Sequence, residues 1–353
     1  PDADDRVLLH TTNAAGGGND RRDIIQMNGD REVISITALP TATFDSTNGG
    51  VANGEFIIRR GNGGLLRTLT LNGEDAIELL GPGGRTLNFD GGGGSGATNG
   101  PANLAFTNPA GANINVEAGT VDISFDITQA ASLTKNGACT LRLGGDNSDA
   151  GATNVAEGVL IAASDTALGA TTGNTTVQDG AVLQLTGGIT IGAGETITIN
   201  GTGPGNNGAI RNVGGNNEIL GTVTVGNSAN IRVNGGTTLV LNTVNGIGGG
   251  QTLTLDGNGA GSQGTIDGVI NSGGGNGGIM KIGNGILSIT AGGALGDTAS
   301  NTDVNSGGQL QLNGGITTPE DIVISGDGGP NNGALRSETG NNTVTGTISM
   351  SGD

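Results

Sequence analysis

Residues 167–225 read ALGATTGNTTVQDGAVLQLTGGITIGAGETITINGTGPGNNGAIRNVGGNNEILGTVTV. Residues 294–350 repeat this pattern as ALGDTASNTDVNSGGQLQLNGGITTPEDIVISGDGGPNNGALRSETGNNTVTGTISM. Gly187 corresponds to Gly314, an offset of 127 residues, whereas Asn216 corresponds to Asn341, an offset of 125. This small drift indicates that loops change length while the strands between them keep their register. Self-similarity over a long period is the sequence signature of a repeat architecture.

The composition excludes several classes of protein. The 353 residues include 74 Gly but only 8 Pro, and no Gly-X-Y period is present, which excludes collagen. Short alternating runs of Val, Ile, Leu and Thr recur throughout the chain, so disorder is a poor interpretation. The sequence therefore predicts many short strands separated by Gly- and Asn-rich turns.

Parallel coiling explains this pattern better than hairpins do. The alternating segments are three to six residues long, and alternation places one face of each inward. Gly-Gly, Asn-Gly and Gly-Asn-Asn, which tolerate tight corners, lie between them. A sandwich would need hairpin-joined strand pairs, whereas a solenoid needs only that each coil bring back the same strand. We therefore predict an all-β parallel β-helix (β-solenoid) with Gly/Asn corners and a narrow aliphatic core, because residues 131–353 contain no aromatic side chain.

The domain organisation divides at about residue 130. Residues 1–130 hold all five Phe, the only His and eight of the 14 basic residues. We expect this atypical part to begin or cap the same solenoid, with the aromatic side chains either filling a wider core or sealing the first coil. Asp75–Leu80 is the one segment that could form a helical turn. Residues 131–353 are expected to be the regular solenoid, with a long repeat of about 126 residues that matches 167–225 to 294–350.

Two segments resemble a known family. Leu133–Leu143 (LTKNGACTLRL) is similar to the LTKxGxGTLxL signature of the autotransporter-associated β-strand repeat, also called the passenger-associated transport repeat. Ile279–Ile289 (IMKIGNGILSI) is a second copy, and Cys139 stands where the family usually has Gly. The resemblance implies a right-handed parallel β-helix in large exported bacterial surface proteins.

The charge balance limits the partners. The formal net charge is −18 and only two Lys are present, so nucleic acid and anionic membrane surfaces are not expected as partners. Cys139 is the single cysteine, which excludes an internal disulfide. The sequence shows no signal peptide and no apolar run long enough for a transmembrane helix. Because the second copy of the repeat stops at Asp353, we expect a fragment of a longer protein.

No catalytic residue is predicted. His10 lies in a Gly/Asn-rich segment without the partners of a triad. The acidic pairs Glu74-Asp75 and Glu320-Asp321 are adjacent in strands, so their side chains should point to opposite faces. A calcium site is a weak candidate at Asp146 and Asp149, although the segment lacks the order of known calcium loops and an Asx-rich turn explains it better. No other cofactor is expected.

The sequence therefore predicts a non-catalytic, extracellular or cell-surface structural protein of a bacterium. One alternative assembles into filaments or a surface layer by self-association through end coils or strand edges. A second alternative is a monomeric adhesin stalk that binds a cell-surface or glycan target. A third, a glycan-cleaving β-helix enzyme, would need a groove of converging acids, which the sequence does not reveal.

Overall fold

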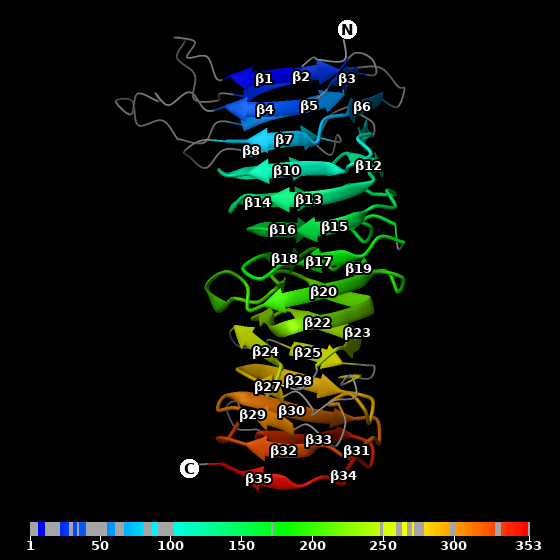
Figure 1. Cartoon of the computed structure of the whole chain (residues 1–353). Helices are drawn as coiled ribbons and strands as arrows, with labels where there is room; N and C mark the ends of the chain where they lie inside the picture. Colours follow the sequence, from blue (N-terminus) through cyan, green and yellow to red (C-terminus); the bar gives the residue numbers. More distant parts are fainter. Residues whose placement is uncertain are drawn as a thin grey trace, which may run out of the picture. The chain divides into compact units, whose positions relative to one another are not determined.

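The computed structural model describes residues 6–10, 22–27, 31–33, 35–39, 55–60, 67–80, 86–90, 102–170, 172–247, 250–258, 263–266, 270–271, 279–296, 301–328 and 333–351. The chain divides into two compact units, Pro1–Gly173 and Asn174–Asp353. In these described residues the regular structure is β-strand apart from one 3₁₀ turn, η2 (Pro204–Asn206). The strands of each unit lie one above another (Figure 1).

The first unit contains three ladders of parallel strands. One ladder runs through β1 (Arg6–His10), β4 (Ser35–Leu39), β7 (Asp75–Leu79), β10 (Ala112–Val116), β13 (Ser132–Asn136) and β15 (Ala152–Val155). A second runs through β2 (Arg22–Met27), β5 (Glu55–Arg60), β8 (Thr86–Asp90), β11 (Thr120–Ile123), β14 (Thr140–Leu143) and β16 (Val159–Ala162). The third consists of β3 (Arg31–Val33), β6 (Arg67–Leu71), β9 (Ala102–Phe106) and β12 (Asp126–Gln129).

The second unit also contains three long parallel ladders, which we call ladders I, II and III. Ladder I comprises β17 (Thr175–Val177), β20 (Thr196–Gly201), the middle of β22 (Asn216–Asn234), the end of β23 (Thr238–Asn245) and β26 (Ile270–Asn271). Ladder II comprises β18 (Val182–Leu185), β21 (Ile210–Asn212), the end of β22, β24 (Thr252–Asn258), β27 (Ile279–Ile282), β29 (Asn301–Val304), β32 (Asp321–Ile324) and β35 (Ile348–Met350).

Ladder III comprises β19 (Thr190–Ile191), the beginnings of β22 and β23, β25 (Gln263–Ile266), β28 (Gly285–Ile289), β30 (Gly308–Asn313) and β33 (Leu335–Thr339). A separate short pair joins β31 (Thr317–Thr318) and β34 (Thr343–Val344). This topology is the predicted parallel β-solenoid. The prediction of a helical turn at Asp75–Leu80 is wrong. Residues Asp75–Leu79 form β7, in which Ile77 and Leu79 are buried on either side of half-buried Glu78 and pair with β4 and β10.

The interior is built from alternate positions of each strand. In β11, β14, β16 and β29 every second residue is buried and the others are partly exposed, as a two-residue period requires. The buried set is dominated by Leu, Ile, Val and Ala. In the first unit Phe89, Phe106 and Phe125 are also buried, and the rings of Phe89 and Phe125 meet edge to face at 5.8 Å. These three aromatic side chains therefore fill the interior of that unit.

Three corner asparagines, of which Asn147 and Asn217 are buried and Asn342 is half-buried, hold successive coils together. The side-chain oxygens of Asn147, Asn217 and Asn342 accept backbone N–H groups of residues Ile127, Ile189 and Ile316, at 2.8, 2.7 and 2.9 Å. Each of these asparagines follows a glycine by two positions: Gly145, Gly215 and Gly340. A Cβ at any of these glycines would lie 2.1–2.4 Å from backbone atoms of the neighbouring coil. Glycine is therefore required where the coils approach, and the asparagine amide satisfies a buried backbone donor.

The long repeat does not restart on the same face. Leu183 of β18 belongs to ladder II, whereas its counterpart in the repeat, Leu310 of β30, belongs to ladder III. Likewise Val177 belongs to ladder I and its counterpart Val304 to ladder II. The second copy is therefore shifted by one face of the solenoid relative to the first.

Candidate functional site

The acidic residues that the sequence analysis considered do not converge. Glu74 and Asp75 are both exposed, whereas Glu320 is fully buried beside exposed Asp321. The Glu320 carboxyl lies inside the solenoid, where the hydroxyl of Thr302 approaches it at 3.4 Å. Its counterpart in the first copy, Glu195, accepts a hydrogen bond from Thr175 at 2.7 Å. These internal acids are repeated parts of the corner structure. The side chain of His10 lies outside the described residues.

The two weak calcium candidates differ in their surroundings. Asp146 is exposed and its backbone N–H donates to the Asp126 carboxylate at 2.8 Å, whereas Asp149 is only 5% exposed. Burial raises the pKa of the Asp149 carboxyl to about 6. Asn147 lies between them and bridges the coils on either side. Within the described part of the chain, no group of three or more His, Cys, Asp or Glu side chains could hold a metal ion.

The lysine of the LTKNG segment, Lys135, is a buried residue that joins two corners of the solenoid. Lys135 is fully buried, and its ammonium donates to the carbonyl oxygens of Asn136, Gly137 and Glu157 at 2.8, 2.6 and 3.1 Å. These bonds use the three donors of the ammonium and connect two successive corners. Desolvation lowers the pKa of Lys135 to about 8, although the nearby Cys139 and Glu157 oppose this shift. We therefore assign Lys135 a structural role, because all three N–H donors of its ammonium group bind backbone carbonyl oxygens.

A polar groove of about 510 Å³ lies on the surface beside this corner. The carboxylates of Asp75, Glu117 and Glu157 line it together with the amides of Asn115 and Asn136. The Asn115 amide donates to Glu117 at 3.3 Å. The three acids come from different coils, a convergence that spacing along the sequence did not predict. The charged side chains that line the groove are all acidic.

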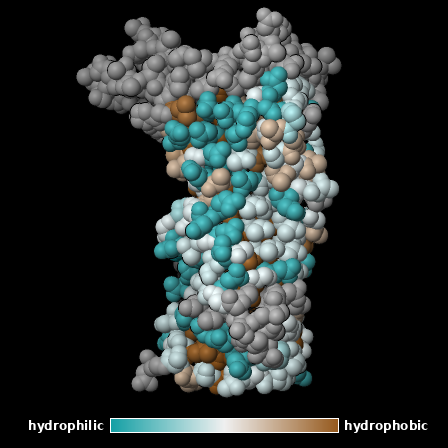
Figure 2. All heavy atoms as spheres, viewed as in Figure 1, coloured by the Kyte–Doolittle hydropathy of each residue, from teal (hydrophilic) through white to brown (hydrophobic). Residues whose placement is uncertain are grey.

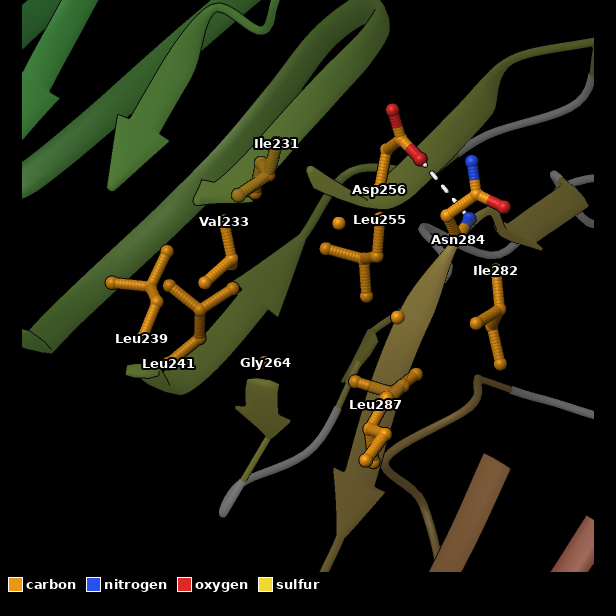
Figure 3. A pocket seen from close by; sticks show the side chains of 13 residues that line it. Ile231, Val233, Leu239, Leu241, Leu255, Asp256, Gly264, Ile282, Asn284 and Leu287 are labelled. Atoms are coloured by element: carbon orange, nitrogen blue, oxygen red, sulfur yellow. Dashed lines mark hydrogen bonds between the residues drawn. The ribbon is translucent and has the colours of Figure 1, made fainter. Parts of the chain in front are cut away.

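The interior of the second unit contains a small apolar cavity (Figure 3). Its volume is about 20 Å³, and it lies where Gly264 occupies a ladder position that Leu239 and Leu287 fill in the adjacent coils. Figure 3 shows leucine and isoleucine side chains around this point, with Asp256 and Asn284 at the rim. The missing side chain of Gly264 explains the cavity. It has room for about one methyl group or one water molecule.

A compact loop closes on itself between β20 and β21. The backbone N–H of Gly208 donates to the carbonyl of Thr202 at 2.8 Å, and the Thr202 hydroxyl donates to the Asn206 side chain at 2.6 Å. Asn206 has a φ of 59°, the left-handed conformation that asparagine tolerates better than most residues. The loop is thus a small rigid projection, and we call residues 202–208 the Asn loop.

Two arginines lie side by side next to the Asn loop. Arg211 of β21 and Arg232 of β22 are direct partners in ladder II, and both point outward because their neighbours in sequence are buried. The Arg232 guanidinium donates to Asn207 of the loop at 2.7 Å, and its Nε lies 3.8 Å from Asp256 on the next strand. Arg211 donates to Asn234 at 3.3 Å. We call Arg211, Arg232 and Asn207 the arginine platform.

The sequence did not single out the arginine platform. Arg211 and Arg232 are 21 residues apart and share no motif, so only the register of the coils brings them together. A coil length of 21 residues at this point would place Arg211 and Arg232 at the same position of successive coils, and this length was the signal that could have found the pair. The platform can supply guanidinium and amide donors to an anionic ligand on the outer surface.

The ladders, aliphatic interior and polar corners define the chain as a parallel β-solenoid. Among the described residues, no helix has the length and apolar character needed to cross a membrane. Figure 2 shows that hydrophilic residues occupy much of the outer surface on the face in view.

Similarity to known proteins is confined to part of the chain. One similar protein is the adhesin BmaC autotransporter of Brucella suis biovar 1 (strain 1330), with 36% identity over 128 residues. The aligned region is 36% of this chain and 3% of that relative, so the chain spans a small fraction of the relative's length. No protein-family model and no solved structure matches the chain. The β-solenoid fold and this similarity fit a surface passenger or adhesin.

Proposed function

We propose that the chain is a non-catalytic segment of an exported bacterial surface protein and that it works as a rigid extracellular shaft. The observation that carries this proposal is the set of continuous parallel ladders in each unit, because they place backbone hydrogen bonds along one direction from coil to coil. The aliphatic interior and the buried corner asparagines add cohesion between neighbouring coils. Such a structure resists extension.

The similarity to an autotransporter adhesin favours a passenger stalk as the biological context. In this form the solenoid holds recognition surfaces away from the cell and binds a host or cell-surface target. A filament or surface-layer component, formed by self-association through strand edges, is the second form of the same structural role. The calcium site predicted at Asp146 and Asp149 is not needed for either form.

The absence of an enzymatic role is part of this proposal. Among the described residues, the acids that line the groove of the first unit lack a basic partner, and buried Glu195 and Glu320 lie in corner structures rather than in a cleft. A glycan-cleaving enzyme needs an acid and a second carboxylate at a defined separation across the scissile bond. Incubation of the chain with polysaccharide panels should therefore release no reducing ends.

Labelling of intact cells of the native source tests the location. Antibodies raised against the 353-residue chain should label unpermeabilised cells, and brief protease treatment of those cells should remove the signal. Labelling that requires permeabilisation would contradict the proposal. Electron microscopy of the released protein then separates the two forms: isolated rods indicate a stalk, whereas long filaments indicate self-association.

A further inference from the structure

We propose that the arginine platform is a binding site for an acidic polysaccharide, with Arg211 and Arg232 contacting carboxylate or sulfate groups of the sugar chain. This inference rests on the proposed surface function and names a ligand class for it.

The charge arrangement is unfavourable unless a ligand uses it. Residues 174–353 contain four basic side chains, and two of them, Arg211 and Arg232, are direct neighbours on adjacent strands. Adjacent strands are about 4.8 Å apart, and like charges at facing positions destabilise a sheet. Among the described residues, the ion pair of these two arginines is the one between Arg232 and Asp256, at 3.8 Å rather than in a close bidentate contact. An anionic group placed between the two guanidinium groups would remove this repulsion.

The platform is already positioned to bind. Asn207 fixes Arg232 from the side of the Asn loop, and Asn234 fixes Arg211. The loop base approaches closely as well, because a Cβ on Gly208 would lie 3.1 Å from the Cβ of Arg232. Each guanidinium has five N–H donors. Arg211 donates from Nε to Asn234, and Arg232 donates from a terminal nitrogen to Asn207. Arg232 retains 20% of its side-chain area, and its Nε is itself buried without a hydrogen-bond partner.

The shape of the platform suits a linear polar ligand. Gln184, Arg211, Arg232 and Asp256 occupy consecutive positions in ladder II, so polar side chains form a row along the direction in which the strands stack. The row offers charged and neutral hydrogen-bonding groups, as a hydroxyl-rich sugar chain with occasional acidic groups requires. A folded protein partner would need buried aromatic or aliphatic anchors, and the row contains none.

The net charge of −18 limits the classes of anionic ligand that the platform could bind. A densely charged polyanion such as nucleic acid would be repelled by the chain as a whole. A polysaccharide with sparse acidic groups would bring few charges close to the protein and could place one of them at the platform. We therefore expect sparsely charged acidic glycans to bind better than dense polyanions.

Calorimetric titration of the full chain with hyaluronan oligosaccharides, which carry one carboxylate per disaccharide, tests the inference. We expect saturable binding with a dissociation constant of about 1 mM or tighter, and no binding of neutral dextran. Chondroitin sulfate oligosaccharides distinguish sulfate from carboxylate recognition. R211Q and R232Q should each weaken binding about tenfold, which corresponds to about 1.4 kcal/mol, and the double variant should abolish it.

R142Q is the matched control because Arg142 is an outward-facing arginine on a ladder in the first unit, paired with Asp122 at 2.9 Å. It changes the net charge equally, so unchanged binding in R142Q supports a local site. Equal loss in R142Q, or no binding of any acidic glycan by correctly folded chain, overturns the inference. Cell labelling remains independent: a surface-exposed chain without glycan binding contradicts only this site, whereas an intracellular chain contradicts the proposed function.

Discussion

Gly264 offers a direct test of how the solenoid interior is packed. The residue occupies a ladder position between Leu239 and Leu287, and the missing side chain leaves a cavity of about 20 Å³. A Cβ at this position would have its nearest neighbours at 4.0 Å, the Ile286 carbonyl oxygen and a Leu287 methyl group, which is ordinary van der Waals contact. Gly264→Ala should therefore fit without displacement of the neighbouring atoms.

The expected gain comes from three terms. Filling 20 Å³ of cavity removes a cost of about 0.5 kcal/mol. Burying one methyl group contributes about 0.8 kcal/mol, and replacing a strand glycine by alanine contributes about 0.5–1 kcal/mol through the unfolded chain. Together these terms lead us to expect that Gly264→Ala raises the free energy of unfolding by about 2 kcal/mol. Gly264→Leu should lose this gain, because the cavity is much smaller than a leucine side chain and overpacking costs about 1–3 kcal/mol.

Urea denaturation of the full chain, followed by circular dichroism and by proteolysis of the second unit, measures the effect. Gly221→Ala is the matched control: a Cβ there would lie 1.7 Å from the carbonyl oxygen of Glu195, so the same substitution should lower the midpoint. If Gly264→Ala lowers the midpoint as Gly221→Ala does, the reasoning about the cavity is refuted. Alanine and leucine variants of equal stability would also contradict it.

The further predictions concern three buried polar residues, Lys135, Asp149 and Asn217. Lys135→Met should destabilise the first unit by about 2–4 kcal/mol, because three carbonyl groups lose their donor; Lys281→Met, in the second LTKNG-like segment, provides a comparison in the same denaturation assay. The pKa of Lys135 is about 8 in the folded chain and 10.5 in the unfolded chain. The folded state therefore loses its proton first, and the free energy of unfolding should rise between these pH values by up to about 3 kcal/mol. Denaturation curves from pH 7 to 11 should show this rise in the native chain, and persistence of the full rise in Lys135→Met would contradict its assignment to Lys135. The pKa of the Asp149 carboxyl is about 6 in the folded chain and 3.8 in the unfolded chain. The unfolded state therefore ionises first, and the free energy of unfolding should fall from pH 4 to pH 6 by up to about 3 kcal/mol. Asp149→Asn should flatten this fall and stabilise the chain at pH 7, whereas an unchanged pH profile would show that another group is responsible. Asn217→Ala should cost about 1–3 kcal/mol because the buried N–H of Ile189 loses its acceptor, while Asn216→Ala, at the exposed neighbouring position, should change the midpoint little.

The fold could be predicted from local signals because a solenoid is assembled from short-range rules. Short alternating runs of Val, Ile, Leu and Thr between Gly/Asn corners predicted short strands, and β18 (Val182–Leu185) is one of the strands that the structure forms from such a run. The segment Asp75–Leu79 was wrongly predicted as a helical turn, because its apolar and acidic residues are compatible with the period of a helix and also with the period of a strand. Only pairing with β10 and β4 decides between them.

The candidate site could not be predicted in the same way. Arg211 and Arg232 become neighbours through a coil length that changes along the chain, and a difference of one residue would turn one side chain inward. The acidic lining of the groove in the first unit has the same origin, since Asp75, Glu117 and Glu157 come from separate coils. The composition boundary at residue 130 and the role of residues 1–130 as a cap remain predictions.

The shift of the long repeat by one face has a consequence for how such a chain can lengthen. Leu183 and Leu310 are counterparts in sequence but occupy different ladders, so the duplicated block contains a whole number of strands and not a whole number of coils. The three ladders of the second unit have similar aliphatic interiors, and a block that begins on one of them can continue on the next without disturbing the stack. A duplicated block must then contain a whole number of strands, but it need not contain a whole number of coils. Recombination between copies has three permitted phases in each coil, and every duplication out of phase presents the copied loops in a new direction.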